Sequence, residues 1–165
     1  MAEDRLKTWE TLYLGYLNPD LNDTAGSMTR DYAVEHNSLK LIFREGEIDF
    51  IASAPLTSSP TEIEILFGRE VKVETSTEII AKKVWHRGTQ FKARDMFDLA
   101  LVAEKEPDAL REIQPVLRDR RQVVLAHIKH ADEQLREDFA QLEVLDYRRT
   151  YDECLRIVQS AFGTK

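Results

Sequence analysis

The chain has 165 residues, of which 42% are hydrophobic and 32% are charged, and its formal net charge is −7. This size and balance fit one globular domain with room for a small appended subdomain, and they exclude fibrous and disordered classes. The acidic total argues against broad electrostatic binding to nucleic acid, because such binding depends on a basic face.

The location of the protein can be predicted from its apolar runs and its cysteine content. No apolar run reaches the roughly 18 residues that a membrane span needs. The opening MAEDRLKTWE lacks the basic start and apolar core of a signal peptide. We therefore expect a cytoplasmic protein with no membrane partner. The single cysteine, Cys154, excludes an internal disulfide, and its apolar helical surroundings predict a buried thiol.

The first forty residues give the weakest pattern. A segment from Leu6 to Leu17 is amphipathic, and NPDLNDTAGS is rich in turn formers and predicts a loop. Ser27 is suited to cap a short helix from Met28 to Glu35.

Two β-prone runs follow, LKLIFR and EIDFIAS, and the turn at residues 45 and 46 predicts that they form a hairpin. Alternation of Leu39 with Leu41, and of Ile48 with Phe50, gives the hairpin one buried face. The other face carries Lys40, Glu47 and Asp49.

A second strand pair, EIEILF with REVKV, is predicted around Gly68, after which the period becomes helical. Thr75 and Glu78 have the spacing of a capping box at a helix start. We expect one helix from about 77 to 87, ended by Gly88, and a second from about 92 to 103.

The rest of the chain has a helical pattern. Pro107 suits a first helical turn, and Thr150 with Glu153 repeats the capping-box spacing before a last helix. Apolar residues at spacings of three and four predict one stripe on a long helix: Val124, Ile128, Ala131, Leu135, Phe139, Leu142 and Leu145.

Strands that precede helices indicate an α+β fold, with a short antiparallel or mixed sheet followed by a helical C-terminal bundle. We place an incomplete α+β domain at residues 1–103 and a helical subdomain at residues 104–165.

A basic stretch interrupts the acidic average. Residues 82 to 94 contain five cations and no acid, namely Lys82, Lys83, Arg87, Lys92 and Arg94. Such a run is compatible with a local anion site and also with a solvated helix face joined to a basic linker.

The run R-D-x-x-D places Asp95 and Asp98 on one helix face beside Arg94. Lys83 and Arg87 are one turn apart on the preceding helix, and a short linker makes the two helices neighbours. Facing cations and carboxylates suit phosphate chemistry, because cations neutralise triphosphate oxygens while a carboxylate binds a metal ion or deprotonates the attacking hydroxyl.

The same residues also fit a structural interpretation. Asp95 falls in the first turn of its helix, where a carboxylate interacts favourably with the helix dipole, and Arg94 could pair with Asp98 on the surface. Spacing alone leaves both interpretations open.

The stretch EIIAKKVWHRGTQFKARDMFDL, residues 78–99, resembles the signature of the AbiEii/AbiGii nucleotidyltransferase-toxin family. That family has a helix of the form E-E-I-x-A-x-K, an arginine-containing turn, and then R-D-L-x-D-L. The matching residues are Thr77, Glu78, Ile79, Ile80, Ala81, Lys83, Arg87, Arg94, Asp95, Met96, Phe97, Asp98 and Leu99. The likeness covers the family's second half and extends loosely from residue 38 to 103.

The resemblance implies specific roles. Lys83 and Asp95 take the places of the family's catalytic lysine and aspartate. Arg87, Arg94 and Asp98 are expected to support the nucleotide or the fold. The implied reaction uses an NTP and Mg²⁺.

Metal binding is where this sequence departs from the superfamily pattern of a G-S turn followed by D-x-D. Gly26 and Ser27 form a G-S pair, but no D-x-D follows them. The superfamily also has a carboxylate on a later strand that helps to hold Mg²⁺, and Asp49 is the expected counterpart. Alternation equally allows Asp49 to be a solvent-facing residue of the hairpin.

Other candidates for a site have simpler explanations. His127 and His130 are three apart on a helix without a third ligand at fitting spacing, and we expect surface histidines. Trp85 could stack a base, yet it fits the buried side of its helix.

Two functions remain open from the sequence. The resemblance implies a toxin of a toxin–antitoxin or abortive-infection system that transfers a nucleotide from an NTP to RNA or protein, with an antitoxin as partner. The alternative is an inactive remnant that acts as a protein-binding module. Without its first strands the domain would expose a sheet edge, which favours homo- or hetero-oligomers.

Overall fold

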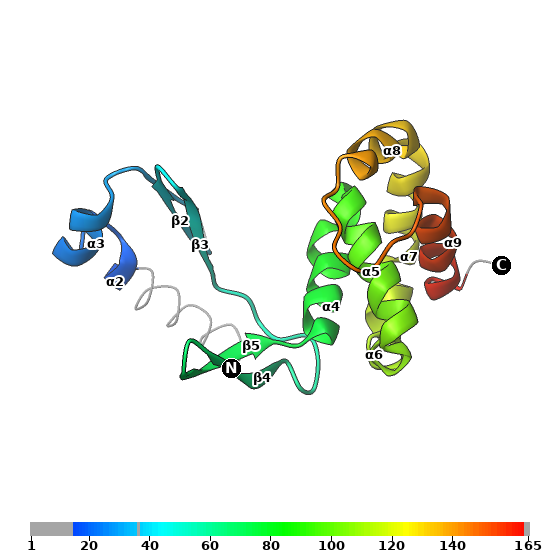
Figure 1. The fold of residues 1–165 in the computed structure, drawn as a ribbon, viewed down its shortest axis with the longest axis horizontal. Coiled ribbons are helices and arrows are strands. Elements are labelled where there is room, and N and C mark those ends of the chain that lie inside the picture. Colours follow the sequence, from blue (N-terminus) through cyan, green and yellow to red (C-terminus); the bar gives the residue numbers. More distant parts are fainter. Residues whose placement is uncertain (1–14, 36, 164–165) are drawn as a thin grey trace. The chain divides into compact units, whose positions relative to one another are not determined.

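The computed structural model describes residues 15–35 and 37–163. These divide into two compact units, one that ends at residue 54 and one that begins at residue 55. Residues 6–14 of the predicted amphipathic segment lie outside the described residues, and α2 spans Gly15–Leu17. Two small antiparallel sheets and a set of helices confirm the α+β fold (Figure 1).

The first unit contains a three-stranded antiparallel sheet in the order β1-β2-β3. Its elements are α3 (Asp23–Met28), β1 (Tyr32–Val34), β2 (Ser38–Phe43) and β3 (Gly46–Ile51). Leu39 lies opposite Phe50 and Leu41 opposite Ile48, and both leucines are buried. The predicted hairpin is therefore confirmed, with its polar side chains on the other face. Its predicted buried face is incomplete, because Ile48 is 45% exposed.

The predicted helix from residue 28 to 35 is wrong. Asn22, and not Ser27, caps the short helix, because its side chain accepts a hydrogen bond from the amide of Ala25 at 3.1 Å. The helix then ends at Met28, and Tyr32 to Val34 satisfy their backbone groups by pairing with β2.

The second unit begins with a hairpin of β4 (Thr61–Leu66) and β5 (Arg69–Glu74), as the sequence predicts. Phe67 and Gly68 form its two-residue turn, and both have positive φ. Two-residue turns with positive φ match the right-handed twist of the strands that they connect. Every residue of β4 is exposed, so the hairpin shields little apolar surface.

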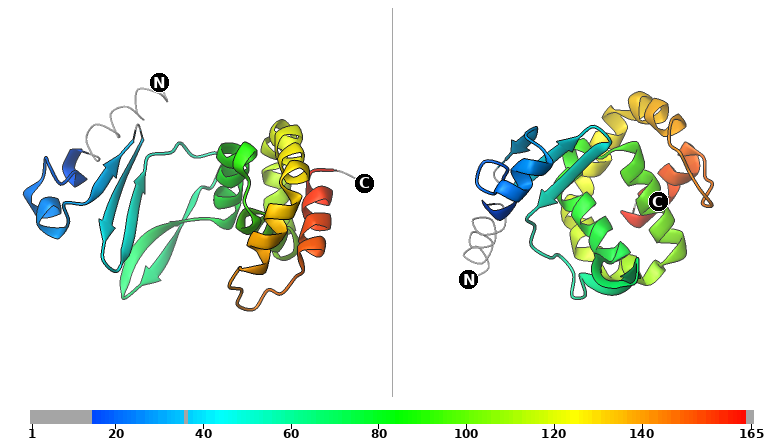
Figure 2. Two further views of the ribbon diagram at one scale, coloured as in Figure 1. Left: turned by 90° about the horizontal axis from the view of Figure 1, so that it is seen from above. Right: turned by 60° about the vertical axis from the view of Figure 1, so that its left-hand side comes forward.

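Helices complete the second unit as one bundle (Figures 1 and 2). They are α4 (Ser76–Arg87), the short 3-10 turn η2 (Gly88–Gln90), α5 (Ala93–Lys105), α6 (Pro107–Glu112), α7 (Gln114–His130), α8 (Asp132–Ala140) and α9 (Tyr151–Ala161). Helix α5 packs along α9. The two compact units of the structure meet at residue 54. The division at residue 103 into an α+β domain and a helical subdomain stays a prediction.

The predicted single C-terminal helix is broken at Ala131, which joins α7 to α8 with non-helical φ and ψ of −100° and 16°. Asp132 opens α8, and its carboxylate accepts a hydrogen bond from the Tyr151 hydroxyl at 2.8 Å. Val124, Ile128 and Leu135 are buried as the stripe predicts. Leu145 lies beyond α8 and is 87% exposed, so the stripe ends before it.

Two further predictions concern single side chains. Cys154 is completely buried on α9, as expected, and burial raises the pKa of its thiol to about 11. Thr150 and Glu153 form the predicted capping box, in which each side chain bonds to the other residue's backbone amide. No described helix is both long enough and apolar enough to cross a membrane.

Candidate functional site

The candidate site lies between α4 and α5, which the buried side chains of the bundle hold together. Ile80 and Val84 of α4 pack in one apolar cluster with Met96 and Leu99 of α5. Gly88 ends α4 with right-handed backbone, φ −45°, a conformation that any residue can adopt. A Cβ at residue 88 would come within 3.2 Å of the Val123 side chain.

Asp95 is the centre of the site and is completely buried. Its Oδ2 accepts a hydrogen bond from the backbone amide of Lys92 at 3.0 Å, which caps the start of α5. Its Oδ1 accepts a bond from Nη1 of Arg87 at 3.0 Å and lies 3.5 Å from Nζ of Lys83. A buried carboxylate needs such partners, because its desolvation is costly.

Lys83 joins the two aspartates. Its ammonium also makes an ion pair with Asp98, one turn further along α5. The side chains of Lys83 and Asp98 are 18% and 26% exposed, and that of Arg87 is 49% exposed. Two cations and two carboxylates therefore form a charge-balanced cluster whose cationic groups are partly exposed to solvent.

The structure thus brings together four of the predicted site residues: Lys83, Arg87, Asp95 and Asp98. Arg94 is not one of them. It is exposed on α5, and within the described ranges no ion pair joins it to Asp98, which pairs with Lys83 instead. Arg94 lines a groove of about 600 Å³ with Phe97, Leu101, Lys105 and residues 143–149.

Asp49 belongs to the first unit and lies on the polar face of β3. Its Oδ1 is 3.6 Å from Nζ of Lys40, which also bonds to Glu47 at 2.8 Å. The side chain is 43% exposed, as the alternating pattern allows.

The described residues do not fit a complete metal site. Across residues 15–35 and 37–163, no group of three or more histidine, cysteine, aspartate or glutamate side chains could hold an ion. The oxygens of Asp95 and Asp98 already face Lys83 and Arg87, and cations beside a carboxylate oppose binding of Mg²⁺.

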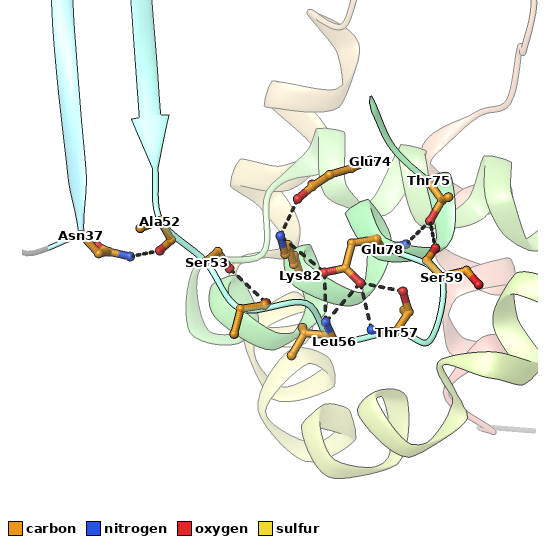
Figure 3. A network of polar contacts seen from close by, with 11 residues as sticks. Asn37, Ala52, Ser53, Leu56, Thr57, Ser59, Glu74, Thr75, Glu78 and Lys82 are labelled. Atoms are coloured by element: carbon orange, nitrogen blue, oxygen red, sulfur yellow. Dashed lines mark hydrogen bonds and ion pairs between the residues drawn. The ribbon is translucent and has the colours of Figure 1, made fainter. Parts of the chain in front are cut away.

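A second carboxylate, Glu78, is completely buried and does not form the predicted capping box with Thr75 in full. Thr75 accepts the expected bond from the amide of Glu78, at 3.2 Å. The Glu78 carboxylate, however, turns to the preceding loop, where it accepts bonds from the amides of Leu56 and Thr57 and from the Thr57 hydroxyl (Figure 3). The amide of Thr75 bonds to the carbonyl of Pro60.

Glu78 therefore fixes the loop before β4 onto α4. Burial raises the pKa of its carboxyl, but the hydrogen bonds from Thr57 and Leu56 outweigh burial and leave the pKa below its ordinary value. Lys82 lies 3.4 Å away and also pairs with Glu74 (Figure 3). The signal in the sequence is that Glu78 falls on the buried stripe of α4, three residues before Ala81.

Trp85 and His127 contact other residues of the helical bundle. Trp85 is partly buried, with the guanidinium of Arg120 4.1 Å from its ring centre. His127 is partly buried and its Nε2 is 3.1 Å from the carbonyl oxygen of Phe91, while His130 is exposed.

Comparison with known proteins identifies the family. The family model described as nucleotidyl transferase AbiEii toxin, type IV toxin–antitoxin system, matches residues 25–162. No curated protein and no solved structure matches the chain. The family match spans both units and includes the whole α4–α5 cluster, in agreement with the resemblance in the sequence. The chain therefore belongs to the AbiEii family of nucleotidyltransferase toxins.

Proposed function

We propose that this protein is a toxin that transfers a nucleotide from an NTP to a cellular acceptor, RNA or protein, through the cluster between α4 and α5. The observation that supports this most is the partly exposed ammonium of Lys83, held between Asp95 and Asp98. A fixed cation at a helix surface is suited to neutralise phosphate charge as it develops during transfer.

Each member of the cluster has a proposed role. Lys83 contacts the phosphates, and the half-exposed guanidinium of Arg87 adds a second contact. The resemblance gives Asp95 a catalytic place, and its burial and its bond to the Lys92 amide favour a positioning role. It aims Lys83 and Arg87. Asp98 is the carboxylate that a bound substrate can reach.

We further propose a divalent metal as cofactor and an antitoxin as partner. The family's enzymes generally use a divalent metal. Asp49 is our proposed carboxylate for Mg²⁺, and there an ion would compete with the Lys40 ammonium, 3.6 Å from Asp49 Oδ1. Since the described residues lack a full set of ligands, no step of the reaction is assigned to the ion. The type IV system implies an antitoxin as partner.

The alternative function is a non-catalytic binding module. It is favoured by the same cluster, because its two cations and two carboxylates satisfy one another without a ligand. Ion-pair networks of this kind also occur as purely structural features.

Transfer can be measured directly with each α-labelled NTP, Mg²⁺, total bacterial RNA and lysate protein. We expect the wild type to label one acceptor class and Lys83→Met to lose about 100-fold or more in rate. Lys129→Met, an exposed lysine of α7, is the matched control and should retain full activity.

Two results would contradict the proposal. Absence of transfer by the folded wild type with every NTP would support the binding module. Equal transfer by Lys83→Met, with an unchanged melting temperature, would remove Lys83 from the reaction.

A further inference from the structure

The strand β5 has an unpaired edge that is complementary to itself. In the part of the chain that the structure describes, β4 and β5 form a sheet of two strands, so β5 has no strand on its other side. An isolated hairpin is marginally stable in water, and its free edge invites another strand.

The backbone shows which residues of β5 face outward. The amide of Thr75 bonds to the carbonyl of Pro60, one step beyond the pair Thr61 and Glu74. Hydrogen bonding alternates along an antiparallel strand. Arg69, Val71 and Val73 therefore direct their backbone groups to β4, whereas Glu70, Lys72 and Glu74 offer theirs to a neighbour.

We propose that β5 pairs antiparallel with β5 of a second copy of this chain, about a twofold axis at Val71. In this register Glu70 of each copy lies opposite Lys72 of the other, and both residues offer outward backbone groups. Two hydrogen-bonded pairs of opposite charge then flank the axis, and such cross-strand pairs stabilise a sheet. The result is a four-stranded sheet in the order β4-β5-β5-β4.

Neighbouring registers are disfavoured by like charges. Moving the axis to Glu70 or to Lys72 places that residue opposite its own copy. An axis at Val73 keeps opposite charges together but pairs only the end of the strand. The edge lysine therefore disfavours the registers in which it meets its own copy. Of the two registers in which a glutamate meets it, only the axis at Val71 pairs most of the strand.

The other edge of the hairpin does not allow the same arrangement. On β4 the outward backbone groups belong to Thr61, Ile63 and Ile65, and the strand has acids at Glu62 and Glu64 without a cation. An axis at Glu62, Ile63 or Glu64 places a glutamate opposite a glutamate. The chemistry therefore selects β5, and a pair about a twofold axis is closed and does not grow into filaments.

Cysteine cross-linking tests the register in the full-length protein. Val71 would face itself as a non-hydrogen-bonded pair, with Cα atoms about 4.5 Å apart, which is within disulfide range. Val71→Cys should form a covalent dimer under mild oxidation. Val73→Cys is the matched control on the same strand and face, and should cross-link at least about tenfold more slowly because it lies opposite Arg69 of the other copy.

Charge-reversal variants test whether the partner of β5 is a second copy of the same strand. Sedimentation equilibrium should show a monomer–dimer equilibrium for the wild type, and Lys72→Glu should raise the dimer Kd about tenfold or more. The double variant Glu70→Lys with Lys72→Glu restores opposite charges and should restore the dimer. Lys129→Glu makes the same charge change on α7 and should leave the Kd unchanged.

Three results would overturn the proposal: a wild type that stays monomeric at every concentration, equal cross-linking by both cysteine variants, or a double variant that remains dissociated. Melting temperatures of all variants exclude loss of folding as the cause. Because these measurements record mass and not nucleotide transfer, failure of the dimer and failure of the enzyme are distinguishable.

Discussion

Two buried carboxylates of the second unit, Glu78 on α4 and Asp95 on α5, differ in their hydrogen-bond partners. Glu78 accepts bonds mainly from amides and a hydroxyl of the loop at residues 56 and 57. Asp95 accepts one backbone bond, and its other partners are the side chains of Lys83 and Arg87. Both side chains are completely buried.

The difference separates a structural carboxylate from a candidate functional one. Backbone donors cannot leave Glu78 without moving the loop, so its bonds contribute to folding. The cations around Asp95 end at the surface, where a ligand anion can share them. Burial alone therefore does not distinguish the two carboxylates, whereas the chemical type and exposure of their partners do.

The largest loss of stability is expected for Glu78→Ala. It leaves the amides of Leu56 and Thr57 without their partner, and we expect about 3 kcal/mol less free energy of unfolding. Urea titration at neutral pH would measure it. A loss below about 0.5 kcal/mol would show that the loop is not held by this carboxylate.

Glu78 should also make stability depend on pH. Its pKa is lowered in the folded state, so its contribution is fully present above the ordinary carboxyl pKa of about 4.3. It is lost as pH falls through the lower folded value. The difference in free energy of unfolding between wild type and Glu78→Gln should therefore become smaller only at acidic pH. A difference in free energy of unfolding that grows at acidic pH would show that folding raises the pKa of Glu78 instead of lowering it.

A smaller loss, about 1–2 kcal/mol, is expected for Asp95→Asn. Asparagine can still accept the bond from the Lys92 amide, but it removes the charge that faces Lys83 and Arg87. Urea titration gives the stability, and the transfer assay should show a far greater loss of activity than of fold. If stability and activity fall in proportion, Asp95 is structural only.

The smallest effect is expected for Arg94→Ala, within about 0.5 kcal/mol of wild type. Arg94 is exposed and, among the described residues, makes no ion pair with the cluster, so NTP affinity should also be unchanged. A calorimetric loss of NTP binding in this variant would place Arg94 in the site after all.

Much of the fold follows from local patterns in the sequence. Alternation predicted the first hairpin and β-prone runs around Gly68 the second, and the Thr150 capping box correctly placed the start of α9. The helix predicted from about residue 92 is α5. The spacing also brought Lys83, Arg87, Asp95 and Asp98 to one place.

The errors arise where long-range contacts decide. The capping-box spacing of Thr75 and Glu78 does not reveal the loop at residues 56 and 57, whose amides draw the Glu78 carboxylate away. The apolar stripe from Val124 to Leu145 predicts one continuous helix. It does not reveal the break between α7 and α8, where Asp132 accepts a hydrogen bond from the Tyr151 hydroxyl. Arg94 has the spacing to pair with Asp98, but Lys83 comes from another helix and takes that partner.

The most direct test of the α4–α5 site is isothermal titration of each NTP against wild type, Lys83→Met and Lys129→Met, with and without Mg²⁺. We predict that wild type and Lys129→Met bind at least one NTP with the same affinity, and that Lys83→Met binds it at least about tenfold more weakly. Identical affinities for all three proteins, or no binding by any of them, would contradict the account.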